Sequence, residues 1–169
     1  MNKEQRKEEF LNLIQENRKI IFKICNSYCK NKDDREDLAQ EIVYQLWKSF
    51  IGFNPDYKFS TWMYRIALNV AISFYRKDKK SRNTISIDEH VIEIEDIIYD
   101  SNESGKNLNL LQRFINELKE LDRALMILYL EEKNYKEISD ILGISETNVA
   151  TKISRIKFKL KQKFTNINN

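Results

Sequence analysis

The side chains of this sequence that are best suited to chemistry lie near its C-terminal end, between residues 145 and 155. Most are short polar or basic groups, which hydrogen-bond to base edges and contact phosphates in the DNA major groove. The candidates are Ser145, Glu146, Thr147, Asn148, Thr151, Lys152 and Arg155. Four more lysines follow by residue 163, and Glu146 is the only carboxylate within the stretch that opposes these cations. This composition predicts contact with DNA.

Two helices must position these residues, and the spacing of the surrounding apolar residues predicts both. Ile138, Ile141 and Leu142 form a stripe on the first helix, and Val149, Ile153 and Ile156 form one on the second. Gly143 stands where a tight turn needs a residue that accepts a positive φ, and Ser145 can cap the second helix. The pattern predicts a helix-turn-helix whose second helix offers its outer face to the major groove. The alternative is a solvated helical hairpin, because two amphipathic helices joined by glycine are common.

The sequence offers little to an enzyme or a metalloprotein. It has no nucleophile–base pair, phosphate-binding loop or metal-ligand cluster, so no catalytic residue, cofactor or metal is expected. Cys25 and Cys29 lie one helical turn apart and far from His90, the single histidine, which favours buried thiols over a zinc site. Two cysteines and no signal peptide indicate a reducing, cytoplasmic location. Membrane insertion is not expected, since no apolar run approaches the roughly 20 residues of a membrane span.

Composition and charge distribution predict an all-α protein in two parts. The 169 residues include only three glycines and one proline, with abundant Lys, Glu, Leu and Ile. The net charge of +3 is modest, but basic runs lie at 76–82 and 152–163 with acidic residues between them. We expect two small helical bundles, 1–79 and 107–169, joined by a flexible acidic linker over residues 80–106. A further hypothesis is that this linker mimics nucleic acid and shields the basic modules in the free protein.

The first bundle begins with one long helix or two short ones between Glu4 and Tyr28. A helix from Arg35 to Phe50 follows, capped by Asp33 or Asp34. It is expected to bury Leu38, Ile42 and Leu46. Its other face includes Asp37, Gln40 and Glu41. Residue chemistry alone favours a solvated face here, and the alternative is a docking surface for a partner that presents Arg and Lys.

A third helix is expected to begin at Ser60 or Thr61. Its predicted buried line is Trp62, Ile66, Val70 and Phe74. Aromatic and cationic side chains alternate around it, and such groups can hold an unpaired nucleic-acid strand. The candidates are Lys58, Phe59, Ser60, Trp62, Arg65, Asn69, Arg76 and Lys77. The alternative is that the rings fill the core of a small bundle.

The two modules, in this order, resemble the extracytoplasmic-function (ECF) sigma factors of bacterial RNA polymerase. In the first module the matching residues are Asp-Leu-Ala-Gln-Glu at 37–41, Leu46-Trp47, and the run Phe-Ser-Thr-Trp-Met-Tyr-Arg-Ile-Ala at 59–67 with Asn69. In the second they are Tyr135, Glu137, Ile138, Leu-Gly-Ile-Ser at 142–145, Val149 and Arg155. The resemblance spans about residues 20 to 164, with the linker unmatched. Ala150 departs from it, because the family usually has a polar residue there and one phosphate contact is then missing.

The resemblance implies a sigma factor that binds core RNA polymerase and directs promoter recognition, DNA melting and transcription initiation. By similarity, Asp37, Gln40 and Glu41 dock on the clamp helices of the largest subunit. The third helix and the loop before it engage the melted strand of the minus-ten element. The second module reads the minus-thirty-five element, while its upper helices meet the flap of the second-largest subunit. An anti-sigma factor is a further partner that the resemblance suggests.

Two other classes of protein remain open at this stage. A stand-alone DNA-binding regulator would need no acidic docking face and would normally dimerise on a palindrome. A helical adaptor would use its charged faces for protein contacts alone. Substitution of Lys152 and Arg155 separates the adaptor from both DNA-binding proteins, because an adaptor would keep its function.

Overall fold

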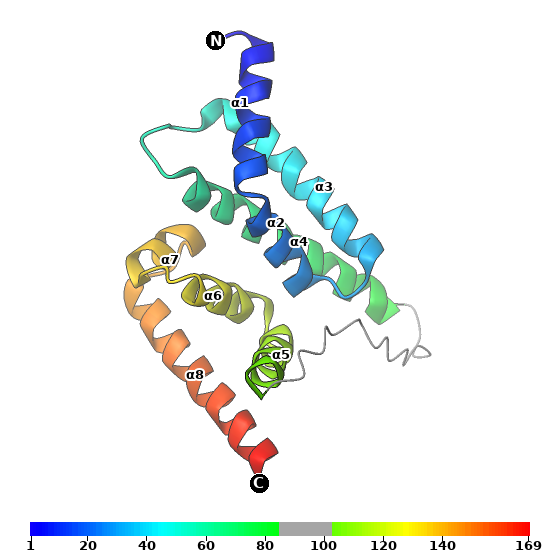
Figure 1. Ribbon diagram of the computed structural model, residues 1–169, viewed down its shortest axis with the longest axis vertical. Helices are drawn as coiled ribbons and strands as arrows, with labels where there is room; N and C mark the ends of the chain where they lie inside the picture. The colour runs from blue at the N-terminus through cyan, green and yellow to red at the C-terminus, as the bar shows by residue number, and fades with distance from the viewer. Residues whose placement is uncertain (85–102) are drawn as a thin grey trace. The chain divides into compact units, whose positions relative to one another are not determined.

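The computed structural model describes residues 1–84 and 103–169, so most of the predicted acidic linker lies outside the described residues. The described residues form eight α-helices and one short 3₁₀ helix, without strands, which confirms the predicted all-α class. The chain divides into two compact units, Met1–Asp78 and Lys79–Asn169 (Figure 1).

The first unit contains α1 to α3 and α4 as far as Asp78. Their bounds are α1 Lys3–Glu16, α2 Arg18–Tyr28, α3 Lys32–Ser49, the 3₁₀ helix Phe50–Gly52 and α4 Phe59–Thr84. The first stretch is therefore two helices, and Asn17 separates them by ending α1 and beginning α2. The cap of α3 differs from the prediction. Asn31 caps it by accepting from the Asp34 N–H at 2.8 Å, so Asp33 and Asp34 lie inside the first turn, where the helix dipole favours acid.

The core of the first unit confirms the prediction for α3 and corrects it for α4. Leu38, Ile42 and Leu46 are fully buried. After Phe59 at its first position, the buried residues of α4 are Met63, Tyr64, Ala67, Leu68 and Ala71, whereas the predicted line of Trp62, Ile66, Val70 and Phe74 is only half-buried. The buried line of α4 thus includes two alanines, Ala67 and Ala71, which both have 0% exposure. A pattern that favours bulky apolar residues therefore points one position away from the true buried line.

Residues 103–169 of the second unit form four helices, as expected from the sequence. They are α5 Glu103–Asn116, α6 Glu120–Leu130, α7 Tyr135–Leu142 and α8 Glu146–Asn168. Helix α8 packs on α6 and α7, and α5 packs on α6 (Figure 1). The helical residues at the end of α4 and the start of α5 extend into the range expected as a linker.

The turn of the helix-turn-helix has the predicted chemistry. Gly143 ends α7 with a left-handed φ of 69°, and its N–H donates to the Ser139 carbonyl. Ser145 caps α8 by accepting from the Asn148 N–H at 3.1 Å. Ser139 adds a side-chain bond across the same turn, since its hydroxyl donates to the Ile144 carbonyl at 2.5 Å. These bonds fix the angle at which α8 leaves α7.

Candidate nucleic-acid and polymerase interfaces

The outer face of α8 gathers most of the predicted DNA-reading residues. Val149, Ile153 and Ile156 are buried, so they turn the opposite side of the helix to solvent. The predicted residues that lie exposed are Ser145, Glu146, Thr147, Asn148, Thr151 and Arg155. The Thr151 hydroxyl donates to the Thr147 carbonyl at 2.9 Å, which leaves its oxygen free to accept a further hydrogen bond.

Lys152 does not share that face. Its side chain is 33% exposed, and its Nζ lies 4.0 Å from Oδ1 of Asp122, which is in the first turn of α6. The position follows from helix geometry, because residue 152 lies one turn from buried Val149 and one turn from buried Ile156. Lys152 therefore does not lie on the exposed face of α8 with the other residues that were predicted to contact DNA.

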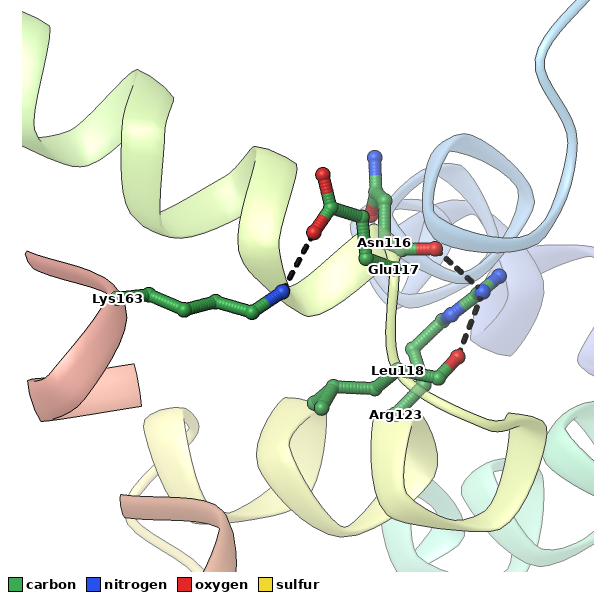
Figure 2. Close-up of polar contacts among 5 residues, drawn as sticks. All are labelled: Asn116, Glu117, Leu118, Arg123 and Lys163. Carbon is green, nitrogen blue, oxygen red and sulfur yellow. Dashed lines mark hydrogen bonds and ion pairs between the residues drawn. The ribbon is translucent and has the colours of Figure 1, made fainter. Parts of the chain in front are cut away.

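The basic tail of α8 also has partners that the sequence did not reveal. Lys157 donates to the Tyr129 hydroxyl at 3.2 Å, and this bond raises the pKa of Lys157. Lys163 donates to Oε2 of Glu117 at 2.6 Å, an ion pair visible in Figure 2. Glu146 is thus not the only carboxylate that opposes these cations. Within the described part of the chain, by contrast, Arg155, Lys159 and Lys161 make no hydrogen bond or ion pair through their side chains.

The acidic face of α3 is exposed as a docking surface requires. Asp37, Gln40 and Glu41 all lie at the surface, and the Gln45 amide donates to Oε1 of Glu41 at 2.9 Å. Tyr44, which was not among the predicted docking residues, is 57% exposed on the same face. The sequence spacing could have indicated that Tyr44 lies on this face. It follows Asp37 by seven residues, and positions i, i+3, i+4 and i+7 share one side of a helix.

The aromatic residues around the start of α4 form one cluster. Ring centroids are 5.0 Å apart for Phe53 and Trp62, 5.4 Å for Phe53 and Phe59, and 5.3 Å for Phe59 and Trp62. Phe59 is buried, with 9% exposed, so for this residue the core-filling alternative holds. Its ring supports the neighbouring loop from inside. Trp62 is only half-buried and keeps part of its ring at the surface.

A polar stripe continues from Trp62 along the outer side of α4. Arg65, Asn69 and Arg76 follow at helical spacing and are exposed, with Lys77 beside them. Lys58 is exposed and Ser60 is half-buried in the loop and first turn. Two further residues complete this surface and were not among the predicted site residues. They are Tyr57, which is 70% exposed next to Lys58, and Ser73, which lies exposed between Asn69 and Arg76.

Cys25 and Cys29 are both buried free thiols. Burial raises the pKa of Cys25 to about 11 and that of Cys29 to about 12, which makes both poor nucleophiles. Across residues 1–84 and 103–169, no three His, Cys, Asp or Glu side chains gather as metal ligands would. No helix in those ranges combines the length and apolar character needed to cross a membrane.

Comparison with known proteins matches two separate parts of the chain to two families of sigma-70 regions. The model of sigma-70 region 2 matches residues 13–81, and that of sigma-70 region 4 matches residues 108–160. ECF RNA polymerase sigma factor SigW of Bacillus subtilis is 27% identical over 157 residues, which cover 87% of this chain and 84% of the relative. RNA polymerase sigma factor YlaC of the same organism is 31% identical over 137 residues, 77% of each chain.

Solved structures show a similar fold at lower identity. The sigma factor RpoE in complex with the anti-sigma factor NepR from Bartonella quintana has a TM-score of 0.67 at 20% identity, covering 94% of this chain and 96% of that one. CnrH in complex with the cytosolic domain of CnrY also has a TM-score of 0.67, at 19% identity, covering 94% and 89%. These structures support the fold, and the two region matches with the Bacillus subtilis relatives identify the family. The chain belongs to the ECF group of RNA polymerase sigma factors.

Proposed function

We propose that this sigma factor binds core RNA polymerase and directs promoter recognition, DNA melting and transcription initiation. The observation that carries the proposal is the presence, in one chain, of two matched sigma regions that each expose a polar surface suited to DNA. Helix α8 offers a face for a duplex, and the stripe on α4 with Trp62 and Tyr57 offers rings and cations for an unpaired strand. The chain has no catalytic role of its own in this proposal, and it acts in the cytoplasm.

The first domain, residues 1–79, would dock on the polymerase and hold the melted minus-ten element. Asp37, Gln40 and Glu41 would meet the clamp helices of the largest subunit, with Tyr44 adding an apolar contact one turn further along α3. Such a face suits a partner that presents Arg and Lys, because charge complementarity guides docking and sets its register.

The stripe on α4 would hold bases of the minus-ten element after the duplex opens. The residues proposed for direct contact are Lys58, Ser60, Trp62, Arg65, Asn69, Arg76 and Lys77, with Tyr57 and Ser73 added. Phe59 would act through the aromatic cluster that shapes the loop. Stacking contributes about 1–3 kcal/mol per base, which offsets an unstacking cost of a few kcal/mol per step. The isolated chain should therefore bind promoter DNA weakly, and the polymerase should supply the remaining surface.

The second domain, residues 107–169, would read the minus-thirty-five element. Short polar groups on the outer face of α8 would reach base edges, and Arg155 would contact either guanine or phosphate. The upper helices α5 and α6 would meet the flap of the second-largest subunit. An anti-sigma factor is a proposed partner, supported by two similar structures solved with bound proteins, one of them named as an anti-sigma factor.

Run-off transcription with purified core polymerase on a pool of promoters with random elements tests the proposal. We expect transcripts that appear only when this protein is added and that start at one distance from a shared two-part motif. The double variant Asp37→Arg, Glu41→Arg is the negative control, since it reverses the docking face without touching either DNA surface. A protein that stimulates no transcription but binds a duplex sequence-specifically by itself would instead be a stand-alone regulator.

A further inference from the structure

A buried arginine organises the turn between α5 and α6. Arg123 is only 3% exposed, and its Nη2 donates to the carbonyl of Asn116 at 2.5 Å and to that of Leu118 at 2.9 Å. Figure 2 shows the side chain reaching both oxygens. These carbonyls lie at the end of α5 and just beyond it, where a helix leaves acceptors without intrahelical donors. Because the guanidinium is planar and rigid, a single side chain fixes both carbonyls and so holds the turn in one conformation.

The same turn carries two carboxylates that reach α8. Glu117, immediately after α5, pairs with Lys163 at 2.6 Å, and Asp122, at the start of α6, lies 4.0 Å from Lys152. The two lysines are eleven residues apart on α8, which is about 16 Å along a helix axis. Two attachment points at that separation fix the direction of the helix as well as its position.

Ring contacts strengthen the attachment at the far end of α8. The Lys163 ammonium lies 5.1 Å from the centre of the Phe114 ring, and Phe164 meets the same ring edge-on at 5.2 Å. Between the two ion pairs, Lys157 donates to Tyr129 on α6. Three lysines of the basic tail are thus engaged with α5, α6 or the turn between them, whereas Arg155 on the outer face is not.

We infer that Arg123 is a positioning residue for readout of the minus-thirty-five element. It holds the turn whose Glu117 and Asp122 tether Lys163 and Lys152, and these tethers aim the outer face of α8 at the DNA. Lys152 is accordingly a tether and not a phosphate contact. The role of α8 in reading the minus-thirty-five element rests on the function proposed above. The tethering of α8 is a property of the free protein and can be measured without DNA.

Neutral substitutions distinguish a tether from a phosphate contact, because the two roles predict different signs. If Lys152 contacts phosphate, Asp122→Asn removes a competing carboxylate and strengthens DNA binding, while Lys152→Gln weakens it. If Lys152 is a tether, both substitutions break the same contact and both lower the discrimination between promoters. The same reasoning applies to Glu117→Gln and Lys163→Gln.

The first measurement uses the full chain assembled with core polymerase. Transcription is compared on a promoter selected from the random pool and on the same promoter with its upstream element scrambled. Each tether variant is expected to lower the ratio of the two by about twofold to fivefold, and Arg123→Lys should lower it at least as much. Lys161→Gln is the matched control, because it removes an exposed lysine of the same helix that has no partner within the described residues, and its ratio should not change. A ratio that stays unchanged in the tether variants would overturn the inference. A general loss of folded protein cannot imitate the expected result, because it lowers both transcripts equally.

The second measurement is amide hydrogen exchange in the free full-length protein. Arg123→Lys and Glu117→Gln should speed exchange in residues 157–168, while Lys161→Gln should not. Glu117 is 49% exposed, so its substitution tests the tether even if Arg123→Lys fails to fold. Unchanged exchange in Glu117→Gln would overturn the inference. Faster exchange in that variant, with no promoter discrimination by the unsubstituted chain, would support the tethers and contradict the proposed function.

Discussion

Arg155 and Lys152 lie three residues apart on α8, yet their surroundings differ. Arg155 is exposed on the outer face, while Lys152 is one-third exposed beside Asp122. Each cation that binds a phosphate releases counterions and contributes about one unit to the slope of log K against log salt. Arg155→Ala should therefore flatten that slope by about one unit, measured by fluorescence anisotropy with holoenzyme and promoter DNA.

Lys152→Gln provides the matched comparison at the residue scale. As a tether it should leave the salt slope nearly unchanged while reducing discrimination between promoters. A loss of about one unit in slope for Lys152→Gln would return this residue to the set of phosphate contacts.

The two buried thiols predict loss of stability at alkaline pH. Burial raises the pKa of Cys25 to about 11 and that of Cys29 to about 12, against 9.0 for an unperturbed thiol. Below pH 9 both thiols are protonated in the folded and the unfolded chain, so their stabilising contribution is complete. As the pH rises from 9 toward 11 and 12, the unfolded chain loses protons that the folded chain keeps, and the contribution is lost.

Urea unfolding of the protein at pH 8 and pH 10.5 measures this effect. The urea midpoint should fall between the two pH values, and the double variant Cys25→Ala, Cys29→Ala should show a smaller fall. The comparison between the two proteins isolates the thiols from the other ionisable groups that both proteins share. An equal fall in both proteins would contradict the assignment to Cys25 and Cys29.

At the scale of the element, the turn before α8 depends on one backbone conformation. Gly143 has a φ of 69°, and a Cβ added there would meet no atom within 4 Å, so only the backbone disfavours a larger residue. Gly143→Ala should cost about 1–2 kcal/mol of unfolding free energy. Gly143→Asn should cost less, because asparagine tolerates the left-handed region. Gly52→Ala is the control, since Gly52 also faces open space but lacks a left-handed φ; a comparable loss there would contradict the backbone explanation.

Helix α3 supports a prediction about polymerase docking. Its buried side holds Leu38, Ile42 and Leu46, so charge reversal of the exposed Asp37 and Glu41 leaves the core intact. Asp37→Arg with Glu41→Arg should abolish co-elution with core polymerase on gel filtration, with an unchanged circular dichroism spectrum. Reversal of Glu8 and Glu9 on exposed positions of α1 adds the same charge elsewhere and should leave binding intact. Co-elution of the α3 variant would refute the docking assignment.

At the scale of the whole molecule, each unit has its own buried core. Ile24, Leu38 and Leu68 are fully buried in the first unit, and Leu125, Ile138 and Ile153 in the second. Fragments 1–84 and 103–169 should therefore each unfold cooperatively on heating and give dispersed amide spectra. At 67 residues the second fragment is the smaller and buries a smaller fraction of its surface on folding, so its melting temperature should be the lower of the two. A fragment that stays unfolded alone would show that its core depends on the rest of the chain.

Features that depend on a few neighbouring residues could be read from the sequence. The all-α class follows from composition and from apolar spacing, which report on the chain over one or two turns. The helix-turn-helix follows from Gly143 and Ser145, because the left-handed turn and the N-cap are local requirements. The exposed positions of Asp37, Glu41 and Arg155 follow from the same periodicity.

Only the tertiary structure decided which surfaces those helices use against one another. The buried line of α4 lies one residue from the predicted line and includes Ala67 and Ala71, which a pattern weighted toward bulky apolar residues passes over. Phe59 is a core residue because the rings of Phe50 and Phe53, which lie before α4, pack against it. Lys163 meets a carboxylate 46 residues away in the chain, and no local pattern contains a partner so distant. The sequence by itself therefore determined which groups are present on α8, and the packing of α5 and α6 decided which of them are left for DNA.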